Sequence, residues 1–151
     1  LMVRDRLKGI SEKSVPILTA PGAVNHFSFG GSPEELPEDF KDRKVRWHSK
    51  KVLQVERSEF ELYKTAEIIA SRLNESKGPS AIIIPKKGFQ TEDAPGRIFF
   101  DPQKRDIFIS TLKERLSSRV KYAELDLHIN DKEFARQVAN AFRSLRKEAS
   151  G

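Results

Sequence analysis

The sequence predicts an α/β protein in which a parallel sheet of about four short strands is flanked by helices in a Rossmann-like, three-layer arrangement. Short β-like segments alternate with longer segments of helical periodicity along the 151 residues. Strand followed by helix, repeated, is typical of a parallel sheet whose crossover connections cover its faces. Capping signals and a Gly-Pro pair separate the two kinds of segment and set their boundaries.

Four segments have the composition of short strands, and they are 15–19, 44–48, 80–84 and 119–125. The third contains three consecutive isoleucines and is continuously apolar, as expected for a strand that is buried on both faces. The second is weaker and suits an edge strand. The fourth alternates apolar and charged residues, which also places it nearer an edge of the sheet.

Three helices have clear boundary signals. Their starts are marked by Ser58 with Glu61, by Asp101 with Pro102, and by Asn130 with Glu133. The first and third pairs have capping-box spacing, and the second pair places a proline at the first helical position. Gly78-Pro79 predicts the end of the first of these helices.

The composition is that of a well-charged globular protein. Lys and Arg number 28 against 22 Asp and Glu, so the net charge is +6. This charge favours solubility and a weak attraction to anions, but basic residues mostly neighbour acidic ones, as on solvated helix faces. Nucleic acid is therefore not an expected partner. The chain has no cysteine, which excludes a disulfide framework, a thiolate nucleophile and a Cys-based zinc site.

The sequence shows no pattern typical of a targeting signal, a membrane-spanning segment or an internal repeat. The longest strongly apolar run, Ala81–Ile84, is too short to cross a bilayer, so no membrane partner is expected. Residues 1–8 alternate charged and apolar side chains and lack the apolar core of a signal peptide. We therefore expect a cytoplasmic location, and we expect residues 1–151 to form a single α/β domain.

Polar residues follow the predicted strands, which is where function is expected. In an open parallel sheet, the loops that leave the carboxyl ends converge on one crevice, and ligands usually bind there. After the first strand, residues 20–31 contain Gly22, Gly30 and Gly31, which can let a ligand approach the backbone. The stretch is neither a Walker A loop nor GxGxxG, so an ordinary long turn is an equal alternative.

The third predicted strand leads into a loop of roughly fifteen residues, a length that is typical of lids and binding loops. Lys86 and Lys87 stand at its start and can hold a phosphate or a carboxylate, while Asp93 can act as a base or a metal ligand. In the alternative interpretation, both lysines are solvated and Asp93 only caps a turn. We favour function, because charged groups are concentrated where the crevice is expected.

Asp126 and His128 follow the fourth predicted strand and alternate with Leu127 and Ile129. Their side chains are therefore predicted to point the same way. An aspartate near a histidine fixes the tautomer and raises the basicity of the ring, as general-base catalysis or metal binding requires. The alternative is a histidine that is hydrogen-bonded to backbone, followed by Asn130 as a helix cap.

The three histidines, His26, His48 and His128, each follow a predicted strand. Three histidines and an aspartate would suit a divalent ion, but their spacing matches no known ligand signature. Scattered polar groups are the preferred interpretation, and no metal is assigned. No G-x-S-x-G sequence occurs, which disfavours a serine hydrolase.

Several loop stretches together carry a family resemblance, and they are Pro21–Asn25 with Phe29-Gly30, Lys86–Gly88, Asp93–Gly96, Phe100–Pro102, Leu125–Asp131 and Phe134-Ala135. On these stretches the chain resembles the second half of the ATP-binding, otherwise uncharacterised proteins named after a tomato mosaic virus resistance protein. The resemblance implies an α/β fold of two related halves, and it implies that this chain is a C-terminal portion. It also implies ATP as a cofactor, with a site mainly on the amino-terminal half.

The resemblance has further implications for partners. The first strands of the family's second half have no counterpart here, so we expect the missing strands to come from another chain. This predicts a homo-oligomer or an association with the missing amino-terminal half, because an open sheet edge needs a partner. In the plant member, the protein binds viral replication proteins.

The leading hypothesis is a C-terminal domain that forms one wall of a cleft for a small anionic ligand of the nucleotide or phosphate type. In this hypothesis His128 and Asp126 serve as acid/base groups, and the ligand-binding residues are Gly22, Asn25, Lys86, Lys87, Gly88, Asp93, Gly96 and Asn130. The alternative is a protein-interaction module without catalysis. Nonspecific RNA binding through the net charge is a third, weaker reading.

Overall fold

A three-stranded parallel sheet lies at the centre of the structure, a computed structural model that describes residues 7–149. Its strands are β1 (Ile17–Thr19), β5 (Ser80–Pro85) and β6 (Val120–Leu125), in the order β1-β5-β6. β5 is the central strand and is buried along its whole length, which explains its continuous run of apolar residues. Residues 1–6, part of the stretch discussed for a signal peptide, lie outside the described part, as do residues 150–151.

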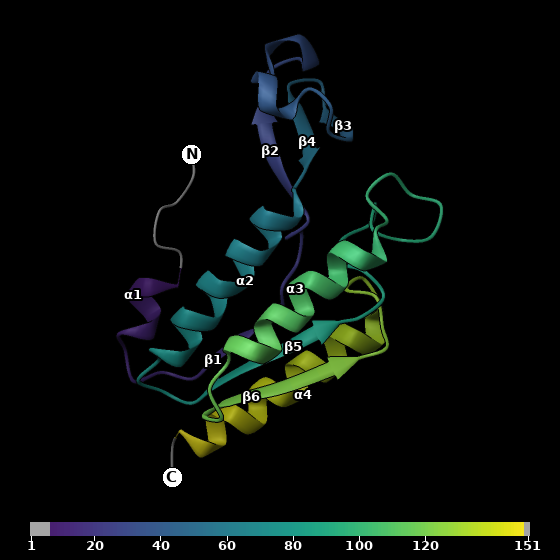
Figure 1. The fold of residues 1–151 in the computed structure, drawn as a ribbon. Coiled ribbons are helices and arrows are strands. Elements are labelled where there is room, and N and C mark those ends of the chain that lie inside the picture. Colours follow the sequence, from purple (N-terminus) through teal and green to yellow (C-terminus); the bar gives the residue numbers. More distant parts are fainter. Residues whose placement is uncertain (1–6, 150–151) are drawn as a thin grey trace.

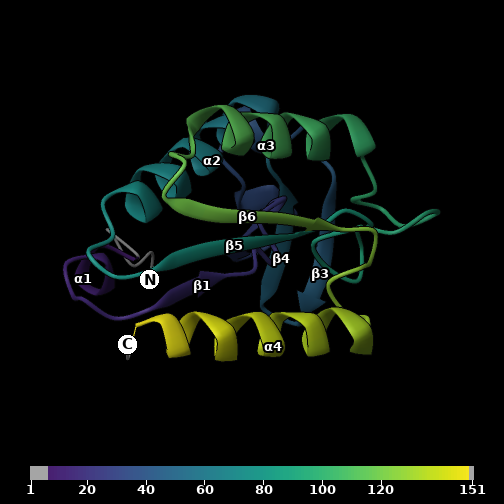
Figure 2. The ribbon, with the colours of Figure 1, turned by 90° about the horizontal axis from the view of Figure 1, so that it is seen from below.

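Helices cover both faces of this sheet (Figures 1 and 2). Helices α2 (Glu59–Asn74) and α3 (Pro102–Arg115) pack side by side on one face, while α4 (Lys132–Glu148) lies on the other, against β1 and β5. The short helix α1 (Lys8–Ser11) packs near α2. The main core lies between α2, α3 and β5 and contains Leu62, Ala66, Leu73, Ile82, Ile84, Phe89, Phe108 and Leu112.

Two of the three predicted helix starts are confirmed by their hydrogen bonds. Ser58 Oγ accepts from the Glu61 N–H at 3.2 Å, and a Glu61 carboxylate oxygen accepts from the Ser58 N–H at 2.8 Å. The Asp101 carboxylate accepts from the Lys104 N–H at 3.0 Å, ahead of Pro102 as the first helical residue. These local signals are sufficient because both partners of each cap lie within one turn.

The third predicted start is wrong by one residue. The N-cap position of α4 is occupied by Asp131 and not by Asn130, and the Asp131 side chain makes no hydrogen bond to the first turn of the helix. The Asp131 carboxylate accepts from the His128 N–H at 2.8 Å, while the Asn130 amide donates to Thr91 Oγ1 at 3.1 Å. Asn130 is therefore used in a contact between loops, which the sequence of the helix start does not reveal.

A second, antiparallel sheet projects beyond the amino end of α2, at the top of Figure 1. It is formed by β2 (His26–Gly30), β4 (Val52–Glu56) and β3 (Val45–Ser49), in the order β2-β4-β3. The prediction of a fourth parallel strand at 44–48 is wrong, because this segment pairs antiparallel with β4. β2 was expected to be loop and β4 was not predicted.

The antiparallel sheet has its own small core. Leu53 and Val55 of β4 are fully buried on one face, beneath two short 3-10 helices, Pro33–Glu35 and Glu38–Phe40. The remaining members of this core are Phe27, Phe29, Leu36, Phe40 and Val45. The opposite face of the sheet carries His26, Ser28 and Gln54, since successive side chains of a strand point to opposite faces.

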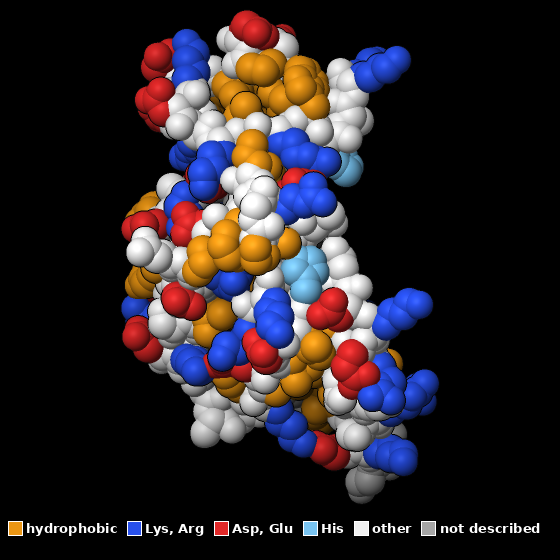
Figure 3. Space-filling model, turned by 90° about the vertical axis from the view of Figure 1, so that its right-hand side faces the viewer, with side chains coloured by type: hydrophobic (Ala, Val, Ile, Leu, Met, Phe, Trp, Pro, Cys, Tyr) orange, Lys and Arg blue, Asp and Glu red, His pale blue; other side chains and the backbone are white. Residues whose placement is uncertain are grey.

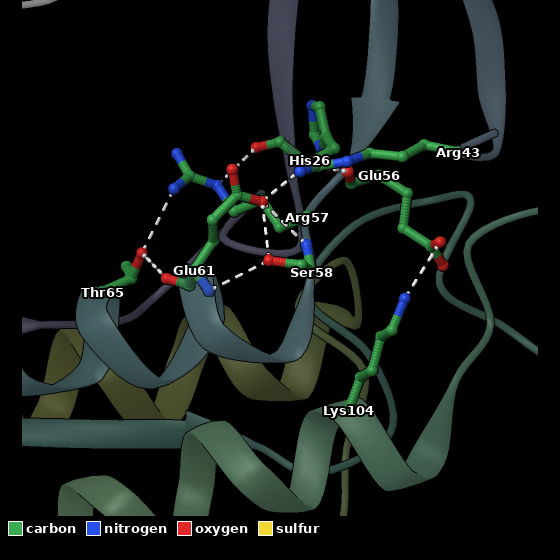
Figure 4. A network of polar contacts seen from close by, with 8 residues as sticks. All are labelled: His26, Arg43, Glu56, Arg57, Ser58, Glu61, Thr65 and Lys104. Carbon is green, nitrogen blue, oxygen red and sulfur yellow. Dashed lines mark hydrogen bonds and ion pairs between the residues drawn. The ribbon is translucent and has the colours of Figure 1, made fainter. Parts of the chain in front are cut away.

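A polar network anchors the antiparallel sheet to the helices (Figure 4). Arg43 Nη1 donates to the Glu61 carboxylate at 2.6 Å and to the Glu56 carbonyl at 3.2 Å. The Glu56 carboxylate in turn pairs with Lys104 of α3 at 2.9 Å. Partial burial raises the pKa of Glu61, but hydrogen bonds from the Ser58 N–H and Arg43 outweigh it and hold the pKa below its ordinary value. Glu61, which completes the capping box of α2 with Ser58, is thus also the anchor of the second sheet.

Candidate functional site

The loops that leave β1, β5 and β6 meet at one edge of the parallel sheet, because the three strands run in the same direction. Backbone hydrogen bonds join them. Ala23 N–H donates to the Phe89 carbonyl at 2.7 Å, Lys87 N–H to the Leu127 carbonyl at 3.0 Å, and Ile129 N–H to the Gly88 carbonyl at 3.1 Å. The structure therefore brings together the three segments in which site residues were predicted.

Figure 3 views this edge of the molecule. Hydrophobic side chains gather over the projecting antiparallel sheet, and a second hydrophobic group lies lower on the same face. Lysine and arginine side chains lie between and below these groups. The face therefore combines apolar patches with exposed positive charge.

Asn25, at the end of the β1 loop, is buried and joins the two sheets. Its Oδ1 accepts from Gln90 Nε2 at 3.1 Å and lies 3.4 Å from His26 Nδ1. On the far side of the ring, His26 Nε2 lies 3.0 Å from Gln54 Nε2, and Gln54 Oε1 accepts from Arg46 at 3.3 Å. The arginine fixes the orientation of the Gln54 amide, so Gln54 donates to His26, and the ring proton of His26 lies on Nδ1.

His26 is held in its neutral form. Its ring stacks on Phe99, with the ring planes 3° apart. Burial, followed by electrostatic interaction with Arg57 and with His48, lowers the pKa of His26 from 6.5 to about 4. His26 is therefore a neutral link between Asn25 and the antiparallel sheet at physiological pH.

His128 has hydrogen-bond partners on both ring nitrogens. Its Nδ1 accepts from the Asn130 N–H at 3.1 Å, so Nε2 carries the proton and donates to the Gln90 carbonyl at 3.0 Å. The Asp126 carboxylate is largely exposed and pairs with Lys87 at 3.0 Å. The contacts of His128 thus match the alternative of a histidine bonded to backbone, and its acid/base role with Asp126 stays a prediction.

Asp93 is buried at the base of the long loop and is paired with Arg105 of α3. Its Oδ1 lies 2.5 Å from Arg105 Nη2, and its Oδ2 accepts from the Phe89 N–H at 2.9 Å. Arg105 Nη1 also donates to the Lys86 carbonyl at 3.1 Å. Asp93 therefore fixes the start of the loop and does not present a free carboxylate to solvent.

Lys86 and Lys87 extend from the carboxyl end of β5, and their side chains are 48% and 57% exposed. Lys86 lies 3.6 Å from the Glu124 carboxylate, whose other oxygen is 2.5 Å from Lys113. Hydrogen bonds from Lys113 and then Tyr122 lower the pKa of Glu124, and burial raises the pKa of Tyr122. These lysines are the accessible cations of the predicted site.

The predicted glycines differ in what requires them. Gly88 has φ +144°, and a Cβ there would lie 2.0 Å from the Asp93 carbonyl and 2.6 Å from the His128 ring. Gly96 has φ +79° but open space around it, so only its backbone conformation requires glycine. A Cβ on Gly22 would lie 2.8 Å from Ile129 Cδ1. Close packing of the three loops on one another therefore accounts for Gly88 and Gly22.

The cavity at this edge is small. Its volume is about 10 Å³, which accommodates about one water molecule. Its lining consists of Asn25, Glu56, Leu62, Phe89, Asp93, Phe99, Asp101, Lys104 and Arg105. A ligand larger than water therefore does not fit inside this cavity.

The three histidines are not brought together as a metal site. His26 and His128 hydrogen-bond to different partners, and His48 lies in β3. Within residues 7–149, no group of three or more His, Asp or Glu side chains is placed to hold a metal ion. Likewise, no helix between residues 7 and 149 is long and apolar enough to cross a membrane.

Four residues with central roles were not predicted. Gln90 connects the loops, and Gln54 contacts His26 within the antiparallel sheet. Arg105 neutralises Asp93, and Ala23 adopts the left-handed conformation with φ 54°. A signal existed for Arg105, since it lies on the apolar face of α3, three and four residues before buried Phe108 and Ile109. A charged residue at such a position indicates a buried partner.

The protein is an α/β protein with helices on both faces of a parallel sheet. An antiparallel sheet follows the first parallel strand, and polar loops gather at the carboxyl ends of the parallel strands. Residues 2–146 match the model described as "Uncharacterised protein family (UPF0261) C-terminal domain", and the chain belongs to this family. The resemblance inferred from the loop stretches is thereby confirmed.

Relatives of known source support the same assignment. A UPF0261 protein of Clostridium tetani is 33% identical over 136 residues, which make up 89% of this chain and 33% of that protein. The ToMV resistance protein Tm-1(GCR237) of Solanum lycopersicum is 32% identical over 139 residues, 91% of this chain and 18% of that protein. A UPF0261 protein of Brucella suis is 28% identical over 91% of this chain. The chain spans about a third of the length of the bacterial relatives.

Proposed function

We propose that this chain is a domain whose carboxyl sheet edge forms one wall of a cleft for a small anionic ligand that carries phosphate. The observation that carries the proposal is the pair Lys86 and Lys87, which places two half-exposed ammonium groups at the end of the central strand. The opposite wall belongs to other parts of a longer protein, since the bacterial relatives are about three times as long as the matched region.

The carboxylates near these lysines leave room for an external anion. The pair between Lys87 and Asp126 joins two exposed side chains, and such pairs contribute at most about 1 kcal/mol to stability. Glu124 is shared between Lys86 and Lys113, so three lysines face two carboxylates. A phosphate, with more charge than a carboxylate, can replace Asp126 at Lys87.

The remaining predicted residues shape this surface in the proposal. Asn25 and His128 hold the loop that begins at Lys86, through Gln90, and Asn130 holds Thr91. ATP stays a candidate ligand on the family resemblance, with its main site expected on the amino-terminal half. Catalysis by His128 and Asp126 is retained as a prediction within the same cleft.

The proposal predicts that phosphate compounds stabilise the protein through Lys86 and Lys87. Inorganic phosphate, ATP and a sugar phosphate are compared with chloride at equal ionic strength in thermal unfolding. At ten times Kd, the free energy of unfolding is expected to rise by about 1.4 kcal/mol, which raises Tm by about 3–5 °C. The double variant Lys86→Gln/Lys87→Gln is expected to lose this rise.

A matched control is the double variant Lys50→Gln/Lys51→Gln, which removes the same charge from the exposed turn between β3 and β4. It is expected to keep the stabilisation by phosphate. An equal loss in both double variants, or no response of the native protein at millimolar ligand, would contradict the proposal.

A second candidate function is protein interaction, and one observation favours it. Phe60 and Ile68 are exposed on α2, eight residues apart and on the same side of the helix, and residue Phe60 is 67% exposed. Exposed apolar side chains on one helix face indicate a contact surface. Lack of any ligand response, together with a stable protein complex that Phe60→Ser weakens, would favour this function.

A further inference from the structure

The helices indicate where the parallel sheet continues. α2 lies in the connection from β1 to β5, and α3 lies in the connection from β5 to β6. Both helices cover one face of the sheet, whereas α4 covers the opposite face (Figure 2). Right-handed crossovers place helices on one face when the chain moves one way across a sheet, and on the other face when it moves the opposite way. The position of α4 therefore indicates a doubly wound sheet, in which strands are added on both sides of β1.

The side of β1 that faces away from β5 is unpaired among the described residues. Ile17 N–H donates to the Pro79 carbonyl beside β5 at 2.9 Å, so the alternation of the strand turns the N–H and carbonyl of Leu18 away from β5. Among the strands in residues 7–149, β5 is the one partner of β1. An exposed edge of this kind is a template for a further strand.

The surface formed by α4 and the residues just before β1 also extends beyond the unpaired side of β1. α4 packs on β1 and β5, and a groove of about 370 Å³ runs where the chain enters β1. The groove is lined by Ser14, Val15, Pro16, Phe142, Arg146 and Ala149. Val15 and Phe142 are exposed there, although both are large and apolar. An additional strand beside β1 would cover this surface.

We propose that the free edge of β1 takes a fourth parallel strand from a part of the longer family protein outside residues 1–151, and that the ligand crevice opens between this strand and loop 20–25. The location of the crevice rests on the proposed function. In doubly wound sheets, ligands bind at the point where the winding direction reverses, at the carboxyl ends of the two strands on either side. Here that point lies beside Gly22 and Asn25.

The loop after β1 supports the location of the crevice, and the direction of β1 disfavours a second copy as the occupant of its edge. Ala23, in the loop after β1, has φ 54°, and such strained non-glycine residues cluster at ligand sites. A second copy fits less well, since a twofold axis would pair β1 with β1 in antiparallel fashion. Such an antiparallel neighbour does not fit the position of α4, since right-handed crossovers join parallel strands.

Amide hydrogen exchange by NMR on the full native polypeptide tests the inference. Leu18 is compared with Tyr122, whose N–H points outward at the opposite edge of the sheet, because the Leu125 carbonyl faces β5 and accepts from Lys86 N–H. We expect the Leu18 amide to exchange about 100-fold more slowly than that of Tyr122. We also expect contacts from Leu18 to a strand outside residues 1–151.

Three results would overturn the strand: equal exchange at Leu18 and Tyr122, protection at Tyr122 alone, or contacts from Leu18 to a second copy. Inorganic phosphate, titrated into the same sample, is expected to shift the amides of Gly22 and Ala23 together with that of Lys87. Shifts at Lys86 and Lys87 without Gly22 would overturn the crevice location and leave the proposed function standing. No shift at any of these amides would overturn the crevice and the proposed function, while the Leu18 result would still decide the strand.

Discussion

At the scale of single residues, the buried charge at the sheet edge depends on one close pair. Asp93 and Arg105 are both almost completely buried, and Asp93 also accepts the Phe89 N–H. A buried charge without its partner is costly, whereas two apolar replacements are often tolerated. The pair therefore holds the loop after β5 because either charge would be costly to bury alone, and not because the two charges attract each other with a large net free energy.

Asp93→Asn is expected to lower the free energy of unfolding by about 3–5 kcal/mol, because Arg105 stays buried without a counter-charge. Urea denaturation measures the change. Asp126→Asn is the control, since Asp126 and Lys87 are both exposed, and it is expected to leave stability nearly unchanged. Adding Arg105→Leu to Asp93→Asn should recover part of the loss. Equal effects of Asp93→Asn and Asp126→Asn would contradict this role.

His26 predicts a specific dependence of stability on pH. Its pKa is lowered to about 4 by burial and by neighbouring positive charge, while the unfolded chain takes up the proton near pH 6.5. Between these values the unfolded state binds more protons at this site, so stability rises with pH and is lost on acidification. The loss between pH 6.5 and pH 4 is expected to be about 2 kcal/mol after discounting for solvent screening.

His26→Gln isolates this contribution from that of the carboxylates. Glutamine can donate to Asn25 and accept from Gln54, but it does not titrate. The difference in unfolding free energy between native protein and variant, measured by urea denaturation from pH 7 to pH 4, should narrow steadily below pH 6.5. Parallel stability curves would show that His26 does not take up a proton in this range.

At the scale of elements, the sequence predicted the helices and strands whose boundaries depend on residues close together in the chain. The capping residues of α2 and α3 and the strand β5 were found because caps and continuous burial leave marks within a few residues. β2 was missed although its His-Phe-Ser-Phe alternation has the period of a strand, since the surrounding glycines indicated a loop. Its pairing with β4 is decided by residues more than twenty positions away.

The candidate site shows the same limit. The convergence of the loops follows from parallel strands, and the sequence predicts it. The partners within the site do not follow, because Gln90 contacts Asn25 and His128 from 65 and 38 residues away. Sequence spacing suggested that Asp126 serves His128, but the Asp126 carboxylate pairs with Lys87 at the end of the neighbouring strand β5.

At the scale of the whole molecule, two sheets with separate cores are joined by polar contacts and by the stacking of His26 on Phe99. The larger core lies between α2, α3 and β5, and the smaller one lies within the antiparallel sheet. Arg43 connects them by its bonds to Glu61 and to the Glu56 carbonyl (Figure 4). Small units with few buried apolar contacts open at lower free energy than large cores. The antiparallel sheet should therefore open first when this connection is weakened.

Arg43→Ala is expected to accelerate amide exchange in β4 without the same effect in β5. The reason is that Glu61 loses its guanidinium partner, while the buried strand β5, which contains Ile83, keeps its contacts. Exchange at Val55 should rise about tenfold or more, and exchange at Ile83 should stay within about twofold, which native-state exchange measures residue by residue. Arg136→Ala removes an exposed pair with Glu133 on α4 and should change neither amide. Equal acceleration at Val55 and Ile83 would mean that both sheets open as one unit, and that the polar junction is not the weak connection between them.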